Sequence, residues 1–241
     1  MSPHHLAIII PAFNPAAGWS GTFLHQWNLL KKELPGYSCT LVVVNDGSVK
    51  PAFEDEIAQL LQAEPMLVAE RLPFNKGKGA ALRAGISRVT ADIYLLTDID
   101  FPYTTQSMLQ TVQALQQPDA ADISAGNRSA AYYGKVPGFR ALLSRSLRYL
   151  IRKRLHLPFD DTQCGLKAMN EKGKQVFMST KITRYLYDLE FIVKATSDRS
   201  LTIRPVAVEL RDGIVMRRMS PRILFQEAAN FFKIILFRHR L

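Results

Sequence analysis

Short apolar runs alternate with amphipathic stretches along the first half of the chain. Each run is rich in aliphatic and β-branched residues and is closed by polar, proline or glycine residues, which is typical of buried strands. The runs cover residues 6–10, 40–44, 66–70, 91–97 and 121–125. Between them, the spacing of apolar residues predicts helices near 21–34, 52–63, 80–89 and 104–116. Alternating strands and helices predict an α/β protein with a mainly parallel sheet covered on both faces.

The second half of the chain has a different pattern. Residues 138–155 combine an apolar helical side with a basic side, and a further helix and strand are predicted from Tyr187 and over 201–210. Near the C-terminus, apolar residues form a helical stripe: Leu224, Ala228, Phe231, Phe232 and Ile235. Each of the two amphipathic helices could pack on the core or lie at a membrane surface, and the pattern leaves both interpretations open.

The net charge of +10 is concentrated in these two segments. Residues 123–159 contain eight basic residues and no acidic one, and residues 211–241 contain seven basic and two acidic residues. Together they carry +13, which leaves −3 for the rest of the chain. Such local charge indicates an anionic partner. A nucleic acid is disfavoured, because the basic residues accompany apolar helical faces and no nucleic-acid recognition motif occurs.

Two cysteines, Cys39 and Cys164, are too few for a disulfide framework, which favours a reduced, intracellular compartment. The first apolar run stops at Pro11 and is too short for a signal peptide. No apolar run reaches the roughly 18 residues of a membrane span. We therefore expect an intracellular protein that is soluble or peripheral.

Candidate chemistry follows three of the predicted strands. Asp98 and Asp100 end the fourth apolar run. In an extended chain residues i and i+2 point the same way, so the pair could present two oxygen ligands to Mg²⁺. The alternative is that one aspartate caps the helix near Thr104. Asp46 and the glycine-rich turn 75–79 also follow strands, and that turn is either an anion site at a helix start or a flexible basic loop.

Five motifs in order give these residues a context: Pro11–Asn14, Val44–Ser48, Asn75–Gly79, Asp98–Asp100 and Asp161–Lys167. Their order and spacing resemble inverting family 2 glycosyltransferases, in particular the branch of dolichyl-phosphate mannose synthases and other polyprenyl-phosphate sugar transferases. The resemblance covers about 6–210 and implies a single GT-A domain over 1–210. Residues 211–241 would then be a basic amphipathic segment, either a membrane-interface helix or a core-packing helix.

The resemblance also implies roles for individual residues. The nucleotide-sugar pocket would include Pro11, Ala12, Asn14, Asp46, Lys76, Gly77 and Asp98. Asp98 and Asp100 would hold Mg²⁺ or Mn²⁺ and, with Asp161, form the catalytic set. The acceptor phosphate would meet Arg128, Arg140, Ser144 and Gln163.

The implied reaction is inverting transfer of a hexose from a GDP-mannose or UDP-glucose type donor to a polyprenyl or dolichyl phosphate. The protein would act as a peripheral enzyme, alone or with a separate membrane protein. Pro15 replaces a usual acidic residue and Pro102 replaces a metal ligand common in the mannose synthases, so the nucleotide stays open. Alternatives are a hydroxyl acceptor with Asp161 as general base, or a catalytically degenerate nucleotide-sugar binder. A nucleotidyltransferase is disfavoured, because no glycine-rich basic loop follows the first strand.

Overall fold

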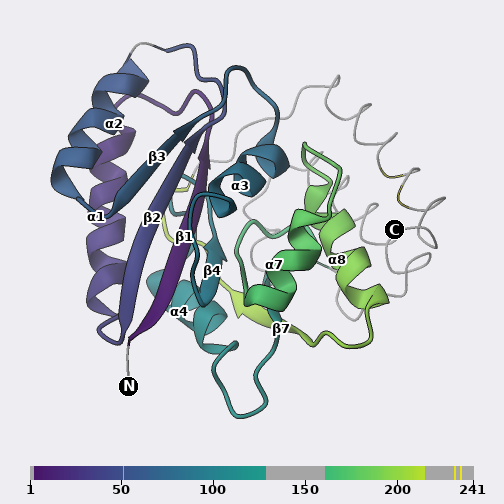
Figure 1. Cartoon of the computed structure of the whole chain (residues 1–241). Helices are drawn as coiled ribbons and strands as arrows, with labels where there is room; N and C mark the ends of the chain where they lie inside the picture. The colour runs from purple at the N-terminus through teal and green to yellow at the C-terminus, as the bar shows by residue number, and fades with distance from the viewer. Residues whose placement is uncertain (1–2, 51, 129–160, 215–230, 232–233, 235–241) are drawn as a thin grey trace.

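A computed structural model describes residues 3–50, 52–128, 161–214, 231 and 234 (Figure 1). The strands are β1 (His4–Ala12), β2 (Tyr37–Asn45), β3 (Leu67–Arg71), β4 (Ile93–Leu96), β5 (Ile123–Arg128), β6 (Lys167–Met169) and β7 (Ile203–Val208). The helices are α1 (Trp19–Lys32), α2 (Ala52–Ala63), α3 (Lys78–Ile86), α4 (Thr105–Gln113), α7 (Glu171–Met178) and α8 (Tyr187–Ser197). The strand–helix alternation expected for the first half is confirmed.

All seven strands form one sheet in the order β3-β2-β1-β4-β6-β5-β7. The pairs β1–β2, β1–β4, β2–β3 and β5–β7 are parallel. Strand β6 is antiparallel to both of its neighbours, β4 and β5. The sheet is therefore mixed and mainly parallel, and it places residues that are far apart in sequence at one edge.

Helices cover both faces of this sheet. Helices α1, α2 and α4 pack on one face, where Ile8 and Ile10 of β1 are fully buried. Helices α3, α7 and α8 pack on the other face, over Ala7 and Ile9 of the same strand. Burial on both faces explains why β1 is a continuous apolar run. Figure 1 shows α1 and α2 side by side at one end of the sheet, with α7 and α8 at the other.

Several boundaries differ from those expected. Strand β5 begins and ends later than 121–125, and α3 starts at Lys78 rather than 80. The hydrophobic pattern predicted neither β6 nor α7. The start of α7 nevertheless has a local signal, because Asn170 caps the helix by accepting a hydrogen bond from the Gly173 N–H at 3.1 Å.

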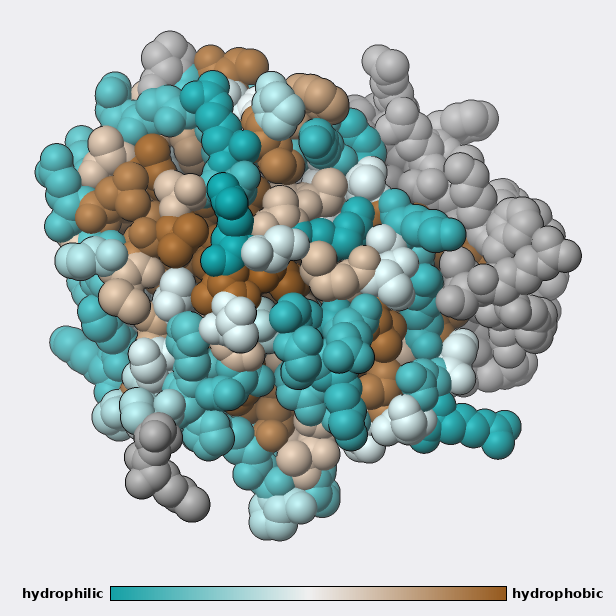
Figure 2. Space-filling model, viewed as in Figure 1, coloured by the Kyte–Doolittle hydropathy of each residue, from teal (hydrophilic) through white to brown (hydrophobic). Residues whose placement is uncertain are grey.

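The expected helix over 138–155, most of the C-terminal stripe, and the acceptor-site candidates Arg140 and Ser144 lie outside the described residues. Within the described part, Phe231 and Ile234 are buried against Leu186, Leu189 and Val193. None of the helices among the described residues is long and apolar enough to cross a membrane. On the face shown in Figure 2, apolar side chains gather over β2, β3 and α2, whereas the surface over α7 is largely hydrophilic.

Candidate active site

The carboxyl ends of β1, β2, β4 and β5 meet at one edge of the sheet, because these strands run in the same direction. Ala12, Asp46, Asp98 and Arg128 lie at or just after these ends. A cavity of about 250 Å³ opens at this edge. Its lining is Pro11, Ala12, Phe13, Asp46, Asn75, Gly77, Lys78, Asp98, Arg184 and Tyr185. In open α/β sheets, ligands bind outside the carboxyl ends of the strands.

Asp46 organises the glycine-rich turn beside this cavity. Its Oδ1 accepts the Lys76 N–H at 2.7 Å, and its Oδ2 accepts the Gly77 N–H at 2.9 Å and the Asn75 side-chain amide at 3.0 Å. Burial raises the pKa of Asp46, and the two backbone hydrogen bonds oppose that rise only in part. Asp46 thus fixes the conformation of the turn and is itself one of the residues that line the cavity.

The glycines of this turn are needed for close contact with another part of the chain. Gly77 has φ +99°, and a Cβ there would lie 2.5 Å from the Thr183 carbonyl oxygen. A Cβ on Gly79 would lie 2.7 Å from the Tyr187 side chain. The expectation that these glycines admit a bound group is therefore incomplete. The segment 182–187 takes most of that space, and it brings Arg184 and Tyr185 to the cavity.

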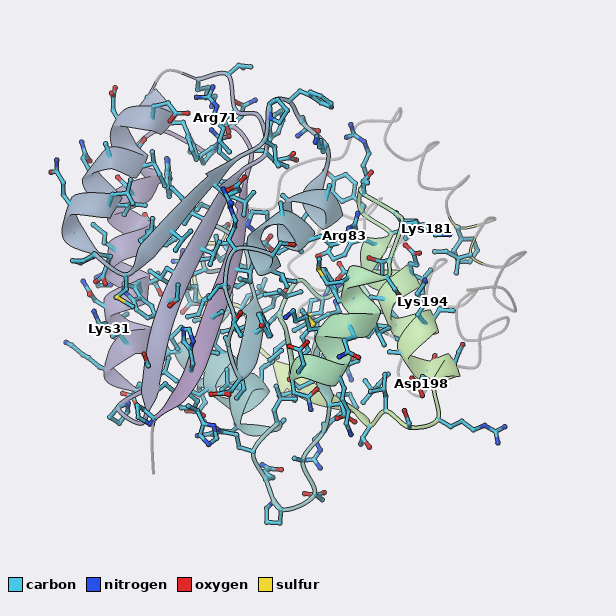
Figure 3. All side chains as sticks on the ribbon, in the orientation of Figure 1. Lys31, Arg71, Arg83, Lys181, Lys194 and Asp198 are labelled. Carbon is cyan, nitrogen blue, oxygen red and sulfur yellow. The ribbon has the colours of Figure 1, made fainter. Side chains whose placement is uncertain are left out.

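This covering segment is tied firmly to α3 and α8. The Gly79 N–H donates to the Thr183 carbonyl at 2.8 Å, and Arg83 of α3 donates to the Thr180 hydroxyl at 2.8 Å. The Glu190 carboxylate of α8 accepts the Lys181 and Ile182 N–H groups at 2.7–2.9 Å. In Figure 3 the labelled Arg83 and Lys181 lie beside each other on this side of the sheet.

Asp98 and Asp100 lie on a turn that follows β4. The strand ends at Leu96, and the Phe101 N–H donates to the Asp98 carbonyl at 3.0 Å. The expectation of an extended Asp98–Asp100 pair is therefore wrong, since this hydrogen bond closes a turn. A helix-capping role is also excluded for the pair, because the Thr104 hydroxyl accepts the Ser107 N–H at the start of α4.

The turn is held in an uncommon backbone conformation. Phe101 has φ +44°, which non-glycine residues rarely adopt. Its ring is buried edge-to-face against Phe23 at 5.2 Å between ring centroids. Arg211 donates to the Phe101 carbonyl at 2.9 Å and to the Asp100 carbonyl at 2.8 Å. Strain of this kind persists only where the surroundings fix it, and it is common at functional sites.

Lys78, the first residue of α3, forms an ion pair with Asp98 at 2.6 Å between Nζ and Oδ1. Burial lowers the pKa of Lys78, but the charges of Asp98 and Asp188 outweigh it, so that the net pKa is raised. The pKa of Asp100 is raised by partial loss of solvation and by the negative charge of Asp98. The edge of the cavity therefore holds a fixed cation beside two carboxylates.

These residues fit a hard divalent cation that takes some ligands from its substrate. Asp98 and Asp100 offer two carboxylates, and the described residues contain no group of three or more His, Cys, Asp or Glu side chains that could hold a metal. Mg²⁺ is commonly bound by one or two carboxylates together with water and substrate phosphates. The arrangement suits a metal that binds together with a phosphorylated ligand.

Arg128, at the end of β5, is bound by Asp161. Its Nε donates to Oδ2 and its Nη2 to Oδ1, both at 2.6 Å, and its backbone N–H donates to Oδ2 at 2.9 Å. Burial would lower the pKa of Arg128, but the hydrogen bonds and charge of Asp161 raise it. Both oxygens of Asp161 are engaged, which suits a positioning role. The catalytic role expected for Asp161 remains a prediction.

The segment from Asp161 to Lys167 connects Arg128 to the cavity. The Tyr103 hydroxyl accepts the Gly165 N–H at 3.2 Å and contacts the Cys164 thiol at 3.3 Å. A Cβ on Gly165 would lie 2.9 Å from the Asp98 Oδ2 and 3.1 Å from the Lys78 Nζ. The backbone of Gly165 therefore lies directly against the Lys78–Asp98 pair, and Gln163 lies partly exposed on the same segment.

A buried ion pair holds the end of this segment in place. The Lys167 Nζ lies 2.6 Å from the Asp188 Oδ1 and also donates to the Cys164 carbonyl. Both side chains are almost inaccessible to solvent. Asp188 lies at the start of α8, so the pair joins the Asp161–Lys167 segment to the helix that follows the covering segment.

The structure brings together many, but not all, of the residues expected at the nucleotide site. Pro11, Ala12, Asp46, Gly77 and Asp98 line the cavity. Asn14 and Lys76 lie next to its lining residues. The Asn14 side chain accepts the Val49 N–H, so its contact with a nucleotide remains a prediction. The sequence interpretation missed the cavity residues Phe13, Asn75, Lys78, Arg184 and Tyr185, although the first three lie within motifs that it had identified.

Comparison with known families shows to which family the chain belongs. The profile described as glycosyl transferase family 2 matches residues 7–173. The chain belongs to glycosyltransferase family 2. The expected membership and enzyme class are confirmed, and the match includes all the motifs from the first strand to the Asp161–Lys167 segment.

Curated relatives of the chain are lipid-phosphate sugar transferases by name. Dolichyl-phosphate beta-glucosyltransferase ALG5A of Trichomonas vaginalis is 26% identical over 245 residues, covering 98% of this chain and 74% of that protein. The human dolichyl-phosphate beta-glucosyltransferase is 26% identical over 203 residues, covering 78% of this chain and 61% of that protein. The chain thus spans about three-fifths to three-quarters of the length of these relatives.

Solved structures show the same fold. Glucosyl-3-phosphoglycerate synthase from Mycobacterium tuberculosis in complex with UDP superposes with a TM-score of 0.70 at 17% identity, covering 98% of this chain and 80% of that chain. The same enzyme in complex with Mn²⁺, UDP-glucose and phosphoglyceric acid gives a TM-score of 0.66 at 15% identity, covering 98% and 79%. The expected GT-A fold is confirmed.

Proposed function

We propose that this protein transfers glucose from UDP-glucose to a polyprenyl or dolichyl phosphate, with inversion at the anomeric carbon. The curated relatives named above are dolichyl-phosphate beta-glucosyltransferases, and a structural neighbour has been crystallised with UDP-glucose. The narrower choice of UDP-glucose over GDP-mannose is supported by both kinds of similarity.

One observation of this structure carries the proposal. A single short segment contacts both the cavity at the carboxyl ends of the strands and the buried Arg128 at the same edge of the sheet. Gly165 lies against Asp98 and Lys78, and Asp161, four residues earlier, holds Arg128. A phosphate bound by Arg128 would therefore approach the cavity along this segment. Arginine suits such a role because its planar guanidinium carries five N–H donors in a fixed geometry that matches carboxylate and phosphate oxygens.

The chemistry needs charge compensation more than a strong base. A phosphate monoester has a second pKa of about 6, so at neutral pH it is largely a dianion and already nucleophilic. Asp98 and Asp100 would hold a divalent metal, which would supply positive charge for the leaving diphosphate. Lys78 adds a positive charge at the same place, and Arg128 orients the attacking phosphate. In-line attack then inverts the anomeric carbon.

The membrane location is also part of the proposal. A lipid phosphate lies at a bilayer surface, and the basic segments 123–159 and 211–241 carry +13 between them. Each Lys or Arg near an anionic bilayer is worth about 1 kcal/mol of binding. We place the enzyme peripherally on the cytoplasmic face, alone or with a separate membrane partner.

The test is a transfer assay with purified protein and Mg²⁺ or Mn²⁺. The donors are UDP-glucose, GDP-mannose and UDP-GlcNAc, each with a short polyprenyl phosphate or the matching polyprenol in detergent. The proposal predicts labelled lipid with UDP-glucose and the phosphate only, and none with Asp100→Ala. Transfer from another donor would correct the sugar or nucleotide. Nucleotide release without labelled lipid would exclude the lipid-phosphate acceptor.

A further inference from the structure

The ion pair between Lys78 and Asp98 engages one of the two carboxylates that we propose as metal ligands. Its atoms are 2.6 Å apart, and the two side chains are 26% and 35% exposed. The Gly165 backbone covers one side of the pair, and both residues line the cavity. An ion pair so placed must be opened, or at least shared, before Asp98 can give the same oxygen to a metal.

The surrounding charges leave Asp98 as the closest partner of Lys78. The other carboxylates near Lys78 are those of Asp188 and Asp100. Asp188 is already paired with Lys167 at 2.6 Å. Asp100 is exposed, and the backbone of its turn is held by Arg211. With Asp98 engaged by Lys78, the described residues leave few ligands for a free metal ion.

A nucleoside diphosphate would change this balance in two ways. Its phosphates would give the Lys78 ammonium group a second anionic partner within the same cavity. The same phosphates would supply oxygen ligands that the two aspartates lack. Both effects favour release of Asp98 to the metal when the nucleotide is present.

We propose that Lys78 neutralises Asp98 in the donor-free enzyme and moves to the donor diphosphate on binding, so that metal and nucleotide bind cooperatively. This inference rests on the proposed nucleotide-sugar function. It gives Lys78 a positioning role in the order of ligand binding, and it predicts that the donor-free enzyme binds divalent metal weakly.

Equilibrium binding tests the inference without turnover. Mn²⁺ binding to the intact protein is measured by calorimetry and by the electron paramagnetic resonance signal of free Mn²⁺, with and without saturating UDP. UDP binding is measured with and without Mn²⁺. Thermodynamic linkage requires UDP to raise the Mn²⁺ affinity by the same factor as Mn²⁺ raises the UDP affinity, and this factor is commonly about 5–150-fold.

The variants are Lys78→Met, Lys78→Gln and Lys78→Arg. Lys172→Met is the matched control, because it removes a lysine that pairs with Asp122 at 3.6 Å outside the cavity.

Removal of the Lys78 charge should change the affinities for Mn²⁺ and for UDP in opposite directions. Lys78→Met should bind Mn²⁺ alone about tenfold more tightly than wild type, bind UDP alone more weakly, and lose most of the coupling. Lys78→Gln should do the same, so a folding defect in one variant does not decide the outcome. Lys78→Arg and Lys172→Met should keep the coupling.

The outcomes separate this inference from the proposed function. Wild-type coupling that persists unchanged in both neutral Lys78 variants would overturn the role of Lys78 and leave the donor site intact. Equally, tight Mn²⁺ binding to the donor-free wild type would overturn the inference alone. Absence of UDP binding by the wild type, with or without Mn²⁺, would overturn the donor site itself and the inference with it.

Discussion

The guanidinium of Arg128 and the carboxylate of Asp161 face each other through two hydrogen bonds of 2.6 Å. Their side chains are 12% and 3% exposed, so water solvates neither charged group well. Removing one partner of such a pair leaves the other charge buried without compensation. Asp161 therefore determines where the arginine points, and the pair should act as a unit.

Asp161→Asn should impair acceptor binding more than the chemical step. Asparagine can accept one of the two hydrogen bonds, but it loses the charge that holds Arg128 in place. We expect the KM for polyprenyl phosphate to rise about tenfold. Because Asp161 is assigned no proton transfer, the dependence of kcat on pH should keep its wild-type shape.

Steady-state kinetics across pH 5.5–9 would check this expectation. Lys172→Met is a suitable control, since its side chain is exposed on α7. Loss of the limb of the kcat profile that reports a deprotonated base, with an unchanged acceptor KM, would instead show that Asp161 acts as a general base.

Gly77→Ala should weaken donor binding through the backbone. At φ +99° and ψ 156° an alanine is strained, and its Cβ would lie 2.5 Å from the Thr183 carbonyl oxygen. We expect a loss of about 1–3 kcal/mol in the free energy of unfolding, together with weaker UDP binding because the Asp46 hydrogen bond is disturbed. Urea unfolding and calorimetry measure the two effects. Gly36→Ala, where a Cβ meets open space, should change neither.

Lys167→Met should be strongly destabilising. It leaves the carboxylate of Asp188, which is 5% exposed, without its cation. The expected loss in the free energy of unfolding is about 3–5 kcal/mol. The double variant Lys167→Met/Asp188→Asn should recover part of that loss, because the uncompensated charge is gone. If the double variant were as unstable as the sum of the two single variants, charge pairing would not be the reason.

Asp122 should contribute to the acid sensitivity of the fold. Burial raises its pKa, but hydrogen bonds from Asn170 and Thr202 and the charge of Lys172 outweigh burial, so the net pKa is lowered. Its contribution is therefore complete above the unfolded pKa of about 3.9 and is lost as the pH falls through the lower folded value. Asp122→Asn should be less stable by about 1 kcal/mol at pH 7, and the difference from wild type should shrink as the pH falls towards 2. Urea unfolding between pH 2 and pH 7 checks this, and a constant difference would contradict it.

Residues directly after strands were the predictable part of the site. The apolar runs located β1, β2 and β4, and parallel strands bring their carboxyl ends together. That is why Asp46 and Asp98 were expected at one edge and lie there, while Pro11 and Ala12, which line the same cavity, were expected from the family resemblance. The local geometry was less predictable. The Asp98–Asp100 segment was expected to be extended, but its turn depends on the buried Phe101 ring and on Arg211 from a distant segment.

The other missed residues were placed by tertiary contacts. Arg184 and Tyr185 follow no strand, and their position depends on the fit of Gly77 and Gly79 against the covering segment. Strand β6 could not be predicted from the sequence either, because it has only three residues, which are too few to show a periodic hydrophobic pattern. Lys78 could have been predicted from the sequence, because its motif was recognised. Sequence alone did not show which of the two lysines in that motif turns toward Asp98.

The hydrogen bonds made by Arg211 have a consequence for the newly synthesised chain. Residues 209–211 run beside residues 102–104 and hold the turn that carries the two aspartates. Strand β7 pairs with the strand that carries Arg128. A nascent chain that has emerged only as far as residue 173 would contain both aspartates and the arginine but not the segment that fixes their turn. The candidate active site should therefore be assembled late in synthesis, after β7 has joined the sheet.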